Sequence, residues 1–181
     1  LPIFWGLASV CDYLLPSIIG NKWDAAIIPT TLVLMLMPLR FSEELFQPAA
    51  KALGHINYLI VNTFYMIAFM SVALLSLHQF GATGLALAWV VGFPLAYLIV
   101  LFRYSKLFQF PLGIFVRSIS KIIVSGIAMV ATVSLLKLYL TDVNLLNMFL
   151  LIIAGGISYV AGLLLLDRTT LVELKQAMSS R

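Results

Sequence analysis

Residues 25–54 read AAIIPTTLVLMLMPLRFSEELFQPAAKALG. The first fifteen carry no charge, whereas the next fifteen include Arg40, Glu43, Glu44 and Lys51. An uncharged apolar run of this length approaches the length of a membrane-spanning helix, about 20 residues. The charges that follow have two explanations: either the hydrophobic span ends here, or the helix carries a polar stripe through the membrane.

The composition indicates that lipid is the solvent of this chain. Of its 181 residues, 62% are hydrophobic and 10% are charged, whereas about a quarter of the residues of a soluble domain are charged. The apolar runs are continuous rather than alternating, which favours helices over strands. We therefore predict an all-α integral membrane protein. The net charge of +4 is spread over loops and one tail, so nucleic acid is not an expected partner.

Six segments are long and apolar enough to be predicted as transmembrane helices, since a span needs about 20 residues. They are residues 1–20, 24–53, 57–77, 82–102, 119–140 and 143–166. The chain divides accordingly into a four-helix part (1–106), an interfacial cytoplasmic elbow (107–118), an additional helix pair (119–166) and a cytoplasmic amphipathic tail (167–181).

The distribution of basic residues predicts the orientation of these helices. Lys and Arg concentrate in 103–121 and in the tail after Leu166, while the hairpin 78–84 has none. Basic loops stay on the cytoplasmic side, so we expect the C-terminus to be cytoplasmic. The chain begins at Leu1 without a basic region before its apolar run. This start is not that of a signal peptide, and we expect it to lie inside a longer protein.

The strongest candidate site is the polar face of the helix predicted over 24–53. Arg40, Glu44, Gln47 and Lys51 follow one another at intervals of four, three and four, and Glu43 lies beside them. Arg40 can pair with either glutamate at helical spacing. Charges inside a membrane normally face a bundle interior or a water-filled cavity. The alternative, in which these residues sit among lipid headgroups, stays open.

Asp12 is a second acidic residue within a predicted span. A protonatable carboxyl there could couple transport to protons or cations, or it could stay neutral and hydrogen-bond to a neighbouring helix. The chain has one cysteine and two histidines, and no metal-ligand cluster, phosphate loop or nucleophile motif is present. The sequence therefore predicts no catalytic residues, no metal site and no cofactor.

The order of several motifs resembles a known family. IIGNKWDAA (18–26) precedes a proline-bearing helix that closes in PAAKALGHINY (48–58), and FGATGLALAWVVGFPLAYLIV (80–100) follows after one more helix. Over about residues 1–105, this arrangement resembles the C-terminal half of polysaccharide flippases. These flippases belong to the multidrug/oligosaccharidyl-lipid/polysaccharide exporter superfamily.

The resemblance implies a two-lobed transporter of 12–14 helices that works by alternating access in the bacterial inner membrane. This chain would supply most of the second lobe, and its partners would be the missing N-terminal lobe and a polyprenyl-pyrophosphate-linked oligosaccharide. Arg40 and Lys51 would attract the anionic substrate, with Glu43 and Glu44 as their partners or as proton-linked modulators. Asp12 and the acidic RFSEE motif (40–44) depart from the family pattern.

Three alternatives to the flippase remain. One is a non-transporting scaffold, in which the charges inside the membrane would be costly without a function. A cation-coupled multidrug exporter of the same superfamily would share the fold. A membrane-embedded polysaccharide polymerase or ligase would be an enzyme, but such enzymes typically need a sizeable extramembrane loop, and the predicted external loops are only a few residues long.

Overall fold

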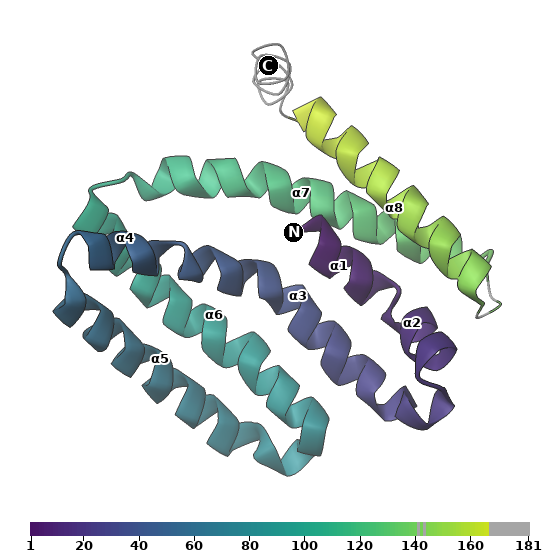
Figure 1. The fold of residues 1–181 in the computed structure, drawn as a ribbon, viewed down its shortest axis with the longest axis horizontal. Coiled ribbons are helices and arrows are strands. Elements are labelled where there is room, and N and C mark those ends of the chain that lie inside the picture. Colours follow the sequence, from purple (N-terminus) through teal and green to yellow (C-terminus); the bar gives the residue numbers. More distant parts are fainter. Residues whose placement is uncertain (141, 143, 167–181) are drawn as a thin grey trace. The chain divides into compact units, whose positions relative to one another are not determined.

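A computed structural model describes residues 1–140, 142 and 144–166, apart from the side chain of Asn21 (Figure 1). Within these residues the secondary structure is entirely helical, and the predicted tail helix lies outside them. The elements are α1 (Pro2–Ser9), α2 (Cys11–Ile18), the 3-10 helix η1 (Asn21–Ala26), α3 (Ile27–Glu44), α4 (Phe46–Ala52), α5 (Ile56–Leu77), the 3-10 helix η2 (His78–Phe80), α6 (Gly81–Phe108), α7 (Leu112–Lys137) and α8 (Leu145–Leu166).

Four stretches of the described chain are long and apolar enough to cross a membrane. The predicted all-α membrane protein is thus supported, but the predicted count of six spans is not confirmed. Residues 1–20 form two short helices that meet at Val10 instead of one span. The four stretches are Lys22–Ala52, Ile56–Phe108, Leu112–Lys137 and Leu145–Leu166.

The chain folds into two compact units. One comprises Leu1–Lys22 and the described residues from Gly113 onward, and the other is Trp23–Leu112. The first unit therefore joins α1 and α2 to α7 and α8, whereas the sequence grouped residues 1–106 as one four-helix part. The second unit contains α3 to α6.

In the first unit, α2 is held by a small apolar core and by two polar contacts. Val10 and Tyr13 pack with buried residues of α7 and α8, among them Val133. The Tyr13 hydroxyl donates to the backbone carbonyl of Leu140. The Lys137 ammonium forms an ion pair with the Asp12 carboxylate. Asp12 thus contacts a neighbouring helix, as one of its two predicted roles requires, but it does so as an ion pair with Lys137 instead of as a neutral carboxyl. The ion-coupling role stays a prediction.

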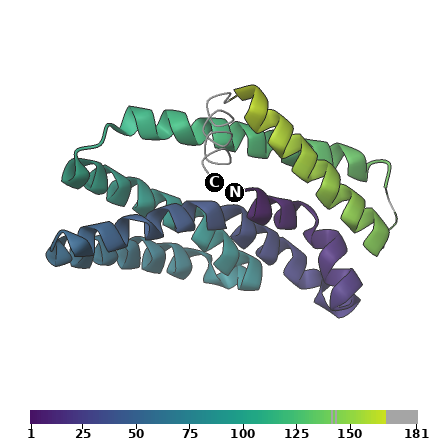
Figure 2. The ribbon, with the colours of Figure 1, turned by 45° about the horizontal axis from the view of Figure 1, so that its top comes forward.

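In the second unit, α5 and α6 form a hairpin and α3 packs on α6 (Figures 1 and 2). The hairpin turns at Gly81, whose φ of 64° lies in a region that residues with a side chain rarely adopt. Gly84, Ala88, Gly92 and Ala96 recur every fourth residue along α6, and all four are buried. Small residues at this spacing let helices approach closely.

The segment predicted as an interfacial elbow is largely helical. Helix α6 extends to Phe108 and α7 already begins at Leu112. Gln109 adopts a left-handed conformation with φ of 53°. Pro111 follows, and proline disfavours helical backbone in the residue before it. The connection is therefore much shorter than the predicted 107–118.

A side chain at Gly92 should separate α5 from α6. A Cβ atom there would lie 2.8 Å from the Ala73 Cβ and 3.2 Å from the Met70 Sδ. Overpacking of this kind typically costs about 1–3 kcal/mol. We expect Gly92→Val to lower the free energy of unfolding by that amount, measured by thermal unfolding in detergent.

Gly156→Val is the matched control, because a Cβ at Gly156 on α8 meets nothing within 4 Å. Equal unfolding temperatures for the two variants would contradict the packing role of Gly92.

Candidate functional site

The residues of the predicted polar face lie on both sides of a helix break. Helix α3 ends at Glu44 and α4 begins at Phe46. Pro48 explains the break, because it lacks the N–H that would bond to the Glu44 carbonyl four residues earlier and its ring crowds that carbonyl. Arg40, Glu43 and Glu44 therefore occupy the end of α3, and Gln47 lies in the first turn of α4.

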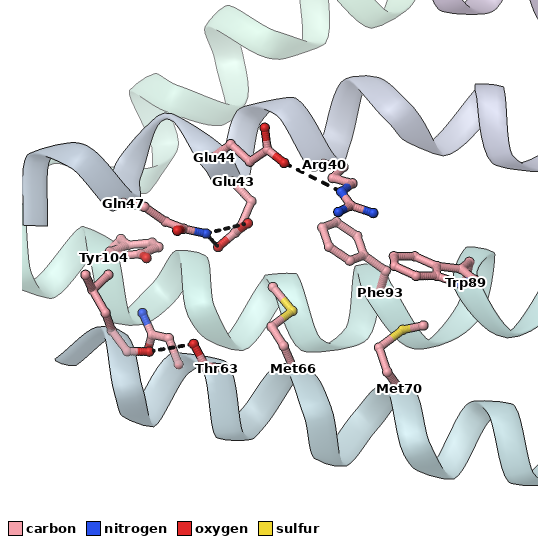
Figure 3. Close-up of a pocket in the computed structure, with 12 residues that line it drawn as sticks. Arg40, Glu43, Glu44, Gln47, Thr63, Met66, Met70, Trp89, Phe93 and Tyr104 are labelled. Atoms are coloured by element: carbon pink, nitrogen blue, oxygen red, sulfur yellow. Dashed lines mark hydrogen bonds and ion pairs between the residues drawn. The ribbon is translucent and has the colours of Figure 1, made fainter. Parts of the chain in front are cut away.

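These four side chains line one cavity within the second unit, with a volume of about 260 Å³ (Figure 3). We call it the polar hollow. Helices α3 and α4 form one wall, α5 a second and α6 a third. The lining residues are Arg40, Glu43, Glu44 and Gln47 from α3 and α4, Leu59, Asn62, Thr63, Met66 and Met70 from α5, and Trp89, Phe93 and Tyr104 from α6.

Arg40 pairs with Glu44 at the edge of the polar hollow. Its Nε lies 3.6 Å from a Glu44 carboxylate oxygen, and the two side chains are 44% and 51% exposed (Figure 3). The guanidinium carbon also lies 5.2 Å from the centre of the Trp89 ring. An exposed ion pair contributes little stability. The Arg40 guanidinium is therefore accessible and is not committed to a rigid structural role.

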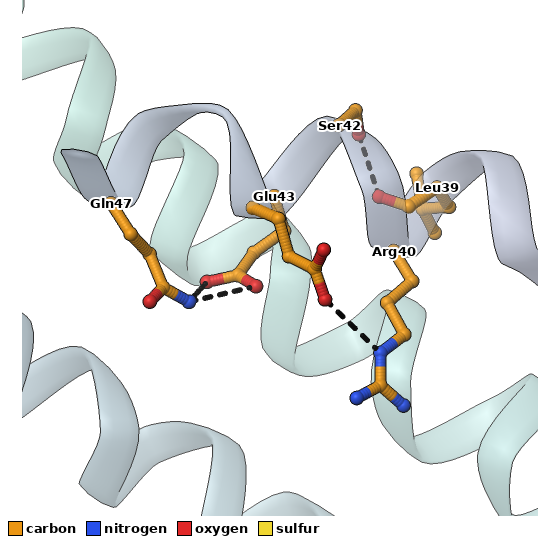
Figure 4. Close-up of polar contacts among 6 residues, drawn as sticks. Leu39, Arg40, Ser42, Glu43 and Gln47 are labelled. Atoms are coloured by element: carbon orange, nitrogen blue, oxygen red, sulfur yellow. Dashed lines mark hydrogen bonds and ion pairs between the residues drawn. The ribbon is translucent and has the colours of Figure 1, made fainter. Parts of the chain in front are cut away.

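Glu43 and Gln47 form a second polar pair, across the break between α3 and α4. The Gln47 amide nitrogen donates to both Glu43 carboxylate oxygens, at 3.1 and 3.3 Å (Figure 4). Next to this pair, the Ser42 hydroxyl bonds to the Tyr97 hydroxyl at 2.8 Å and so connects α3 to α6. The α3 wall is thereby fixed in rotation, with Glu43 lining the hollow.

The α5 wall is organised by an arginine of α6. The Arg103 Nε donates to the Asn62 Oδ1 at 2.6 Å. Its guanidinium carbon lies 4.3 Å from the centre of the Tyr58 ring and 5.4 Å from that of Tyr65. The Tyr58 hydroxyl in turn donates to the backbone carbonyl of Arg103 at 2.8 Å. These contacts join α5 to α6 and hold Asn62 in place.

Aromatic residues surround the Tyr104 end of the polar hollow. Tyr104 is fully buried, and its ring centre lies 5.0 Å from that of Phe46 and 5.9 Å from that of Phe108. Phe46 also stacks on Phe110 at 5.8 Å. This cluster seats α4 against the end of α6. In Figure 3, Gln47 lies near Tyr104, and Arg40 lies near Phe93 and Trp89 at the other end of the view.

Two of the predicted site residues lie elsewhere. Lys51 is exposed on α4 and does not line the polar hollow. Asp12 belongs to the first unit, where it pairs with Lys137. Their predicted roles in substrate binding and ion coupling stay predictions.

Sequence reasoning missed the role of Arg103. It counted this residue as a loop cation that sets the membrane orientation, whereas the structure places it inside α6. A signal was available on α5, where Tyr58, Asn62 and Tyr65 are spaced by four and three residues and so share one face. A polar and aromatic face on an otherwise apolar helix needs a polar partner.

The polar hollow carries groups that can bind a ligand. Carboxylates accept hydrogen bonds, amides donate and accept, and aromatic faces offer apolar contact. Within the described residues, no group of three or more His, Cys, Asp or Glu side chains could hold a metal ion. Comparisons of the chain with protein-family models, with curated proteins and with solved structures find no match.

Arg103 should contribute more to the stability of the protein than Lys106, the next basic residue on α6. Arg103→Gln removes the contacts with both tyrosine rings and alters the bond to the buried Asn62, so we expect the free energy of unfolding to fall by about 2 kcal/mol. Arg103→Lys should not restore it, because an ammonium lacks the planar, stacking guanidinium.

Lys106→Gln is the control, since Lys106 is exposed one turn further along α6 and its ammonium lies 4.5 Å from the centre of the Phe102 ring. Thermal unfolding in detergent compares the three variants. A stability of Arg103→Lys equal to that of the unaltered protein would contradict the stacking role.

Proposed function

We propose that this chain is part of a polysaccharide flippase. In this proposal it moves a polyprenyl-pyrophosphate-linked oligosaccharide from the cytoplasmic to the periplasmic leaflet of a bacterial inner membrane. The chain supplies most of the second lobe of a 12–14-helix transporter, its C-terminus faces the cytoplasm, and the transporter works by alternating access. Two findings support this proposal, the resemblance of the sequence to polysaccharide flippases and the polar hollow.

One observation carries the proposal. Arg40, Glu43 and Glu44 belong to a stretch long and apolar enough to cross a membrane, and all three line the same polar hollow. Each charge on a membrane helix costs roughly 2.5–3.5 kcal/mol at the bilayer centre. Polar residues that converge on one cavity favour a path for a polar substrate over a purely structural role.

The remaining lining residues fit a sugar. Sugar hydroxyls both donate and accept hydrogen bonds, which matches the carboxylate of Glu43 and the amides of Gln47 and Asn62. The rings of Trp89 and Phe93, whose centres lie 6.2 Å apart, offer apolar surface to the carbon–hydrogen faces of a sugar ring. A few polar groups set among aromatic side chains are typical of small-molecule sites.

The volume of the polar hollow is below that of a complete site. At about 260 Å³, it is smaller than the roughly 300–1,000 Å³ of pockets for drug-sized ligands. It would accept one small part of an oligosaccharide. In the proposed two-lobed transporter, the other lobe would supply the rest of the cavity.

Arg40 provides the test of this function. Its accessible guanidinium would attract the pyrophosphate or acidic sugars of the substrate, so Arg40→Ala in the full-length protein should abolish surface polysaccharide while protein abundance stays normal. Surface polysaccharide is measured by immunoblotting of whole cells, and abundance by an epitope tag on the transporter.

Lys51→Ala is the matched control, because it removes a cation from the same stretch that lies outside the polar hollow. Unchanged polysaccharide in Arg40→Ala would sink the flippase proposal. Loss of polysaccharide in both variants would extend the substrate path to α4.

One observation favours a second candidate, the cation-coupled multidrug exporter. The lining of the polar hollow holds two acidic residues, Glu43 and Glu44, against the single base Arg40, together with Met66 and Met70. An acidic lining with flexible thioethers suits apolar cations. Drug efflux that is lost in Glu43→Gln, with polysaccharide unaffected, would support this candidate over the flippase.

A further inference from the structure

Arg40 borders two cavities of the second unit. Besides the polar hollow, a smaller cavity of about 150 Å³ lies between α3 and α6. Arg40 and Trp89 line both cavities. Because there is open space on either side of it, close packing does not fix the position of the Arg40 guanidinium. Its direction therefore depends on the groups that attract it.

Two groups attract this guanidinium from different helices. On α3, a Glu44 carboxylate oxygen lies 3.6 Å from the Arg40 Nε, which is longer than a hydrogen bond. On α6, the centre of the Trp89 ring lies 5.2 Å from the guanidinium carbon, within the range of about 6 Å over which a ring face attracts a cation. In Figure 3 the guanidinium lies between the Glu44 carboxylate and the rings of Phe93 and Trp89.

The Trp89 ring belongs to a row of three aromatic side chains on α6, which we call the aromatic ladder. Trp89, Phe93 and Tyr97 recur every fourth residue and so lie on one face of the helix. Neighbouring ring centres lie 6.2 and 6.1 Å apart. Phe93 and Tyr97 are buried, and Tyr97 is hydrogen-bonded to Ser42 of α3 at 2.8 Å. The ladder is thus anchored to α3 two residues from Arg40, and this anchor holds the Trp89 ring at a fixed distance from that arginine.

The acidic residues of the polar hollow compete with a ligand for Arg40. Glu43 and Glu44 follow it by three and four residues, the two spacings at which side chains meet on a helix. Glu43 is already bonded to Gln47, so Glu44 is the stronger competitor. A guanidinium bonded closely to Glu44 would have to give up that bond before it could bind another anion.

We propose that Trp89 is the positioning residue of Arg40. Its ring holds the guanidinium away from the Glu44 carboxylate and so keeps the terminal nitrogens available for a phosphate group. Guanidinium groups bind phosphates and carboxylates in the same way, through two parallel hydrogen bonds, so a close pair with Glu44 would use the donors that the phosphate needs. The choice of a phosphate rests on the proposed function, in which the substrate carries a pyrophosphate.

The test measures the binding of inorganic pyrophosphate to the full-length protein in lipid nanodiscs. Equilibrium dialysis with the radiolabelled anion gives the Kd. Pyrophosphate carries no sugar, so the result does not depend on any contact between Trp89 and a sugar ring. We expect Trp89→Leu to raise the Kd about fivefold, because the attraction of the ring for the guanidinium is lost.

Trp23→Leu is the matched control. It makes the same chemical change in the same unit, at an exposed residue that lines neither cavity. We expect it to leave the Kd for pyrophosphate within about twofold of that of the unaltered protein.

A double variant distinguishes positioning from a general loss of structure. Glu44→Gln replaces the competing carboxylate by a neutral amide, so Arg40 no longer needs to be held away from it. We therefore expect the addition of Trp89→Leu to Glu44→Gln to raise the Kd less than about twofold. A merely structural role of Trp89 predicts the same fivefold increase in both backgrounds.

A difluorinated tryptophan at Trp89 carries the test if Trp89→Leu is not recovered as a folded protein. Fluorine atoms withdraw electron density from the ring face and so weaken its attraction for a cation, while the size of the ring hardly changes. We expect this replacement to raise the Kd about twofold, and an unchanged Kd would contradict the proposal.

Equal Kd values for the unaltered protein and folded Trp89→Leu would overturn the proposal, as would an equal effect of Trp89→Leu with and without Glu44→Gln. An unaltered protein that binds no pyrophosphate would also overturn it. Failure of the flippase function gives a different result. If Trp89→Leu weakens pyrophosphate binding while Arg40→Ala leaves surface polysaccharide unchanged, the positioning role stands and the flippase function falls.

Discussion

The close approach of α5 to α6 is the constraint on which the second unit depends. The small residues Gly84, Ala88 and Gly92 bring the two helices together, and only at that separation can Arg103 reach Asn62 across the interface. Membrane helices associate through close packing at small residues, because burying apolar side chains against each other gives little advantage in lipid. The polar contacts of the hairpin follow from this packing.

The polar hollow is a consequence of placing a third helix against this hairpin. Ser42 fixes the rotation of α3 through its bond to Tyr97, and the side chains one and two residues further on, Glu43 and Glu44, then line the hollow. The two sides of the hollow therefore differ in rigidity. The α5 wall is held rigidly by Arg103, whereas the edge formed by Arg40 is accessible.

The helical character, the small-residue packing and most of the polar face were predictable, because each depends on local composition and on the helical period. The contact between Asp12 and Lys137 was not, since 125 residues separate them and no pattern in one sequence reveals such a pairing. Arg103 was expected in a loop, whereas it lies in α6 and bonds to Asn62, because a single sequence does not show which side chain an arginine contacts. The resemblance to flippases stays a prediction, because no comparison tests it.

The Pro48 break places the proposed ligand site next to the junction of two helices. The proline removes a backbone bond at the junction of α3 and α4, and the side-chain pair of Glu43 and Gln47 bridges the same junction. The Glu43 carboxylate therefore both lines the hollow and stabilises the junction of α3 and α4. Under the proposed function, a ligand that donates a hydrogen bond to this carboxylate would compete with Gln47 for it. Binding of the ligand would then change how firmly α3 and α4 are held at their junction.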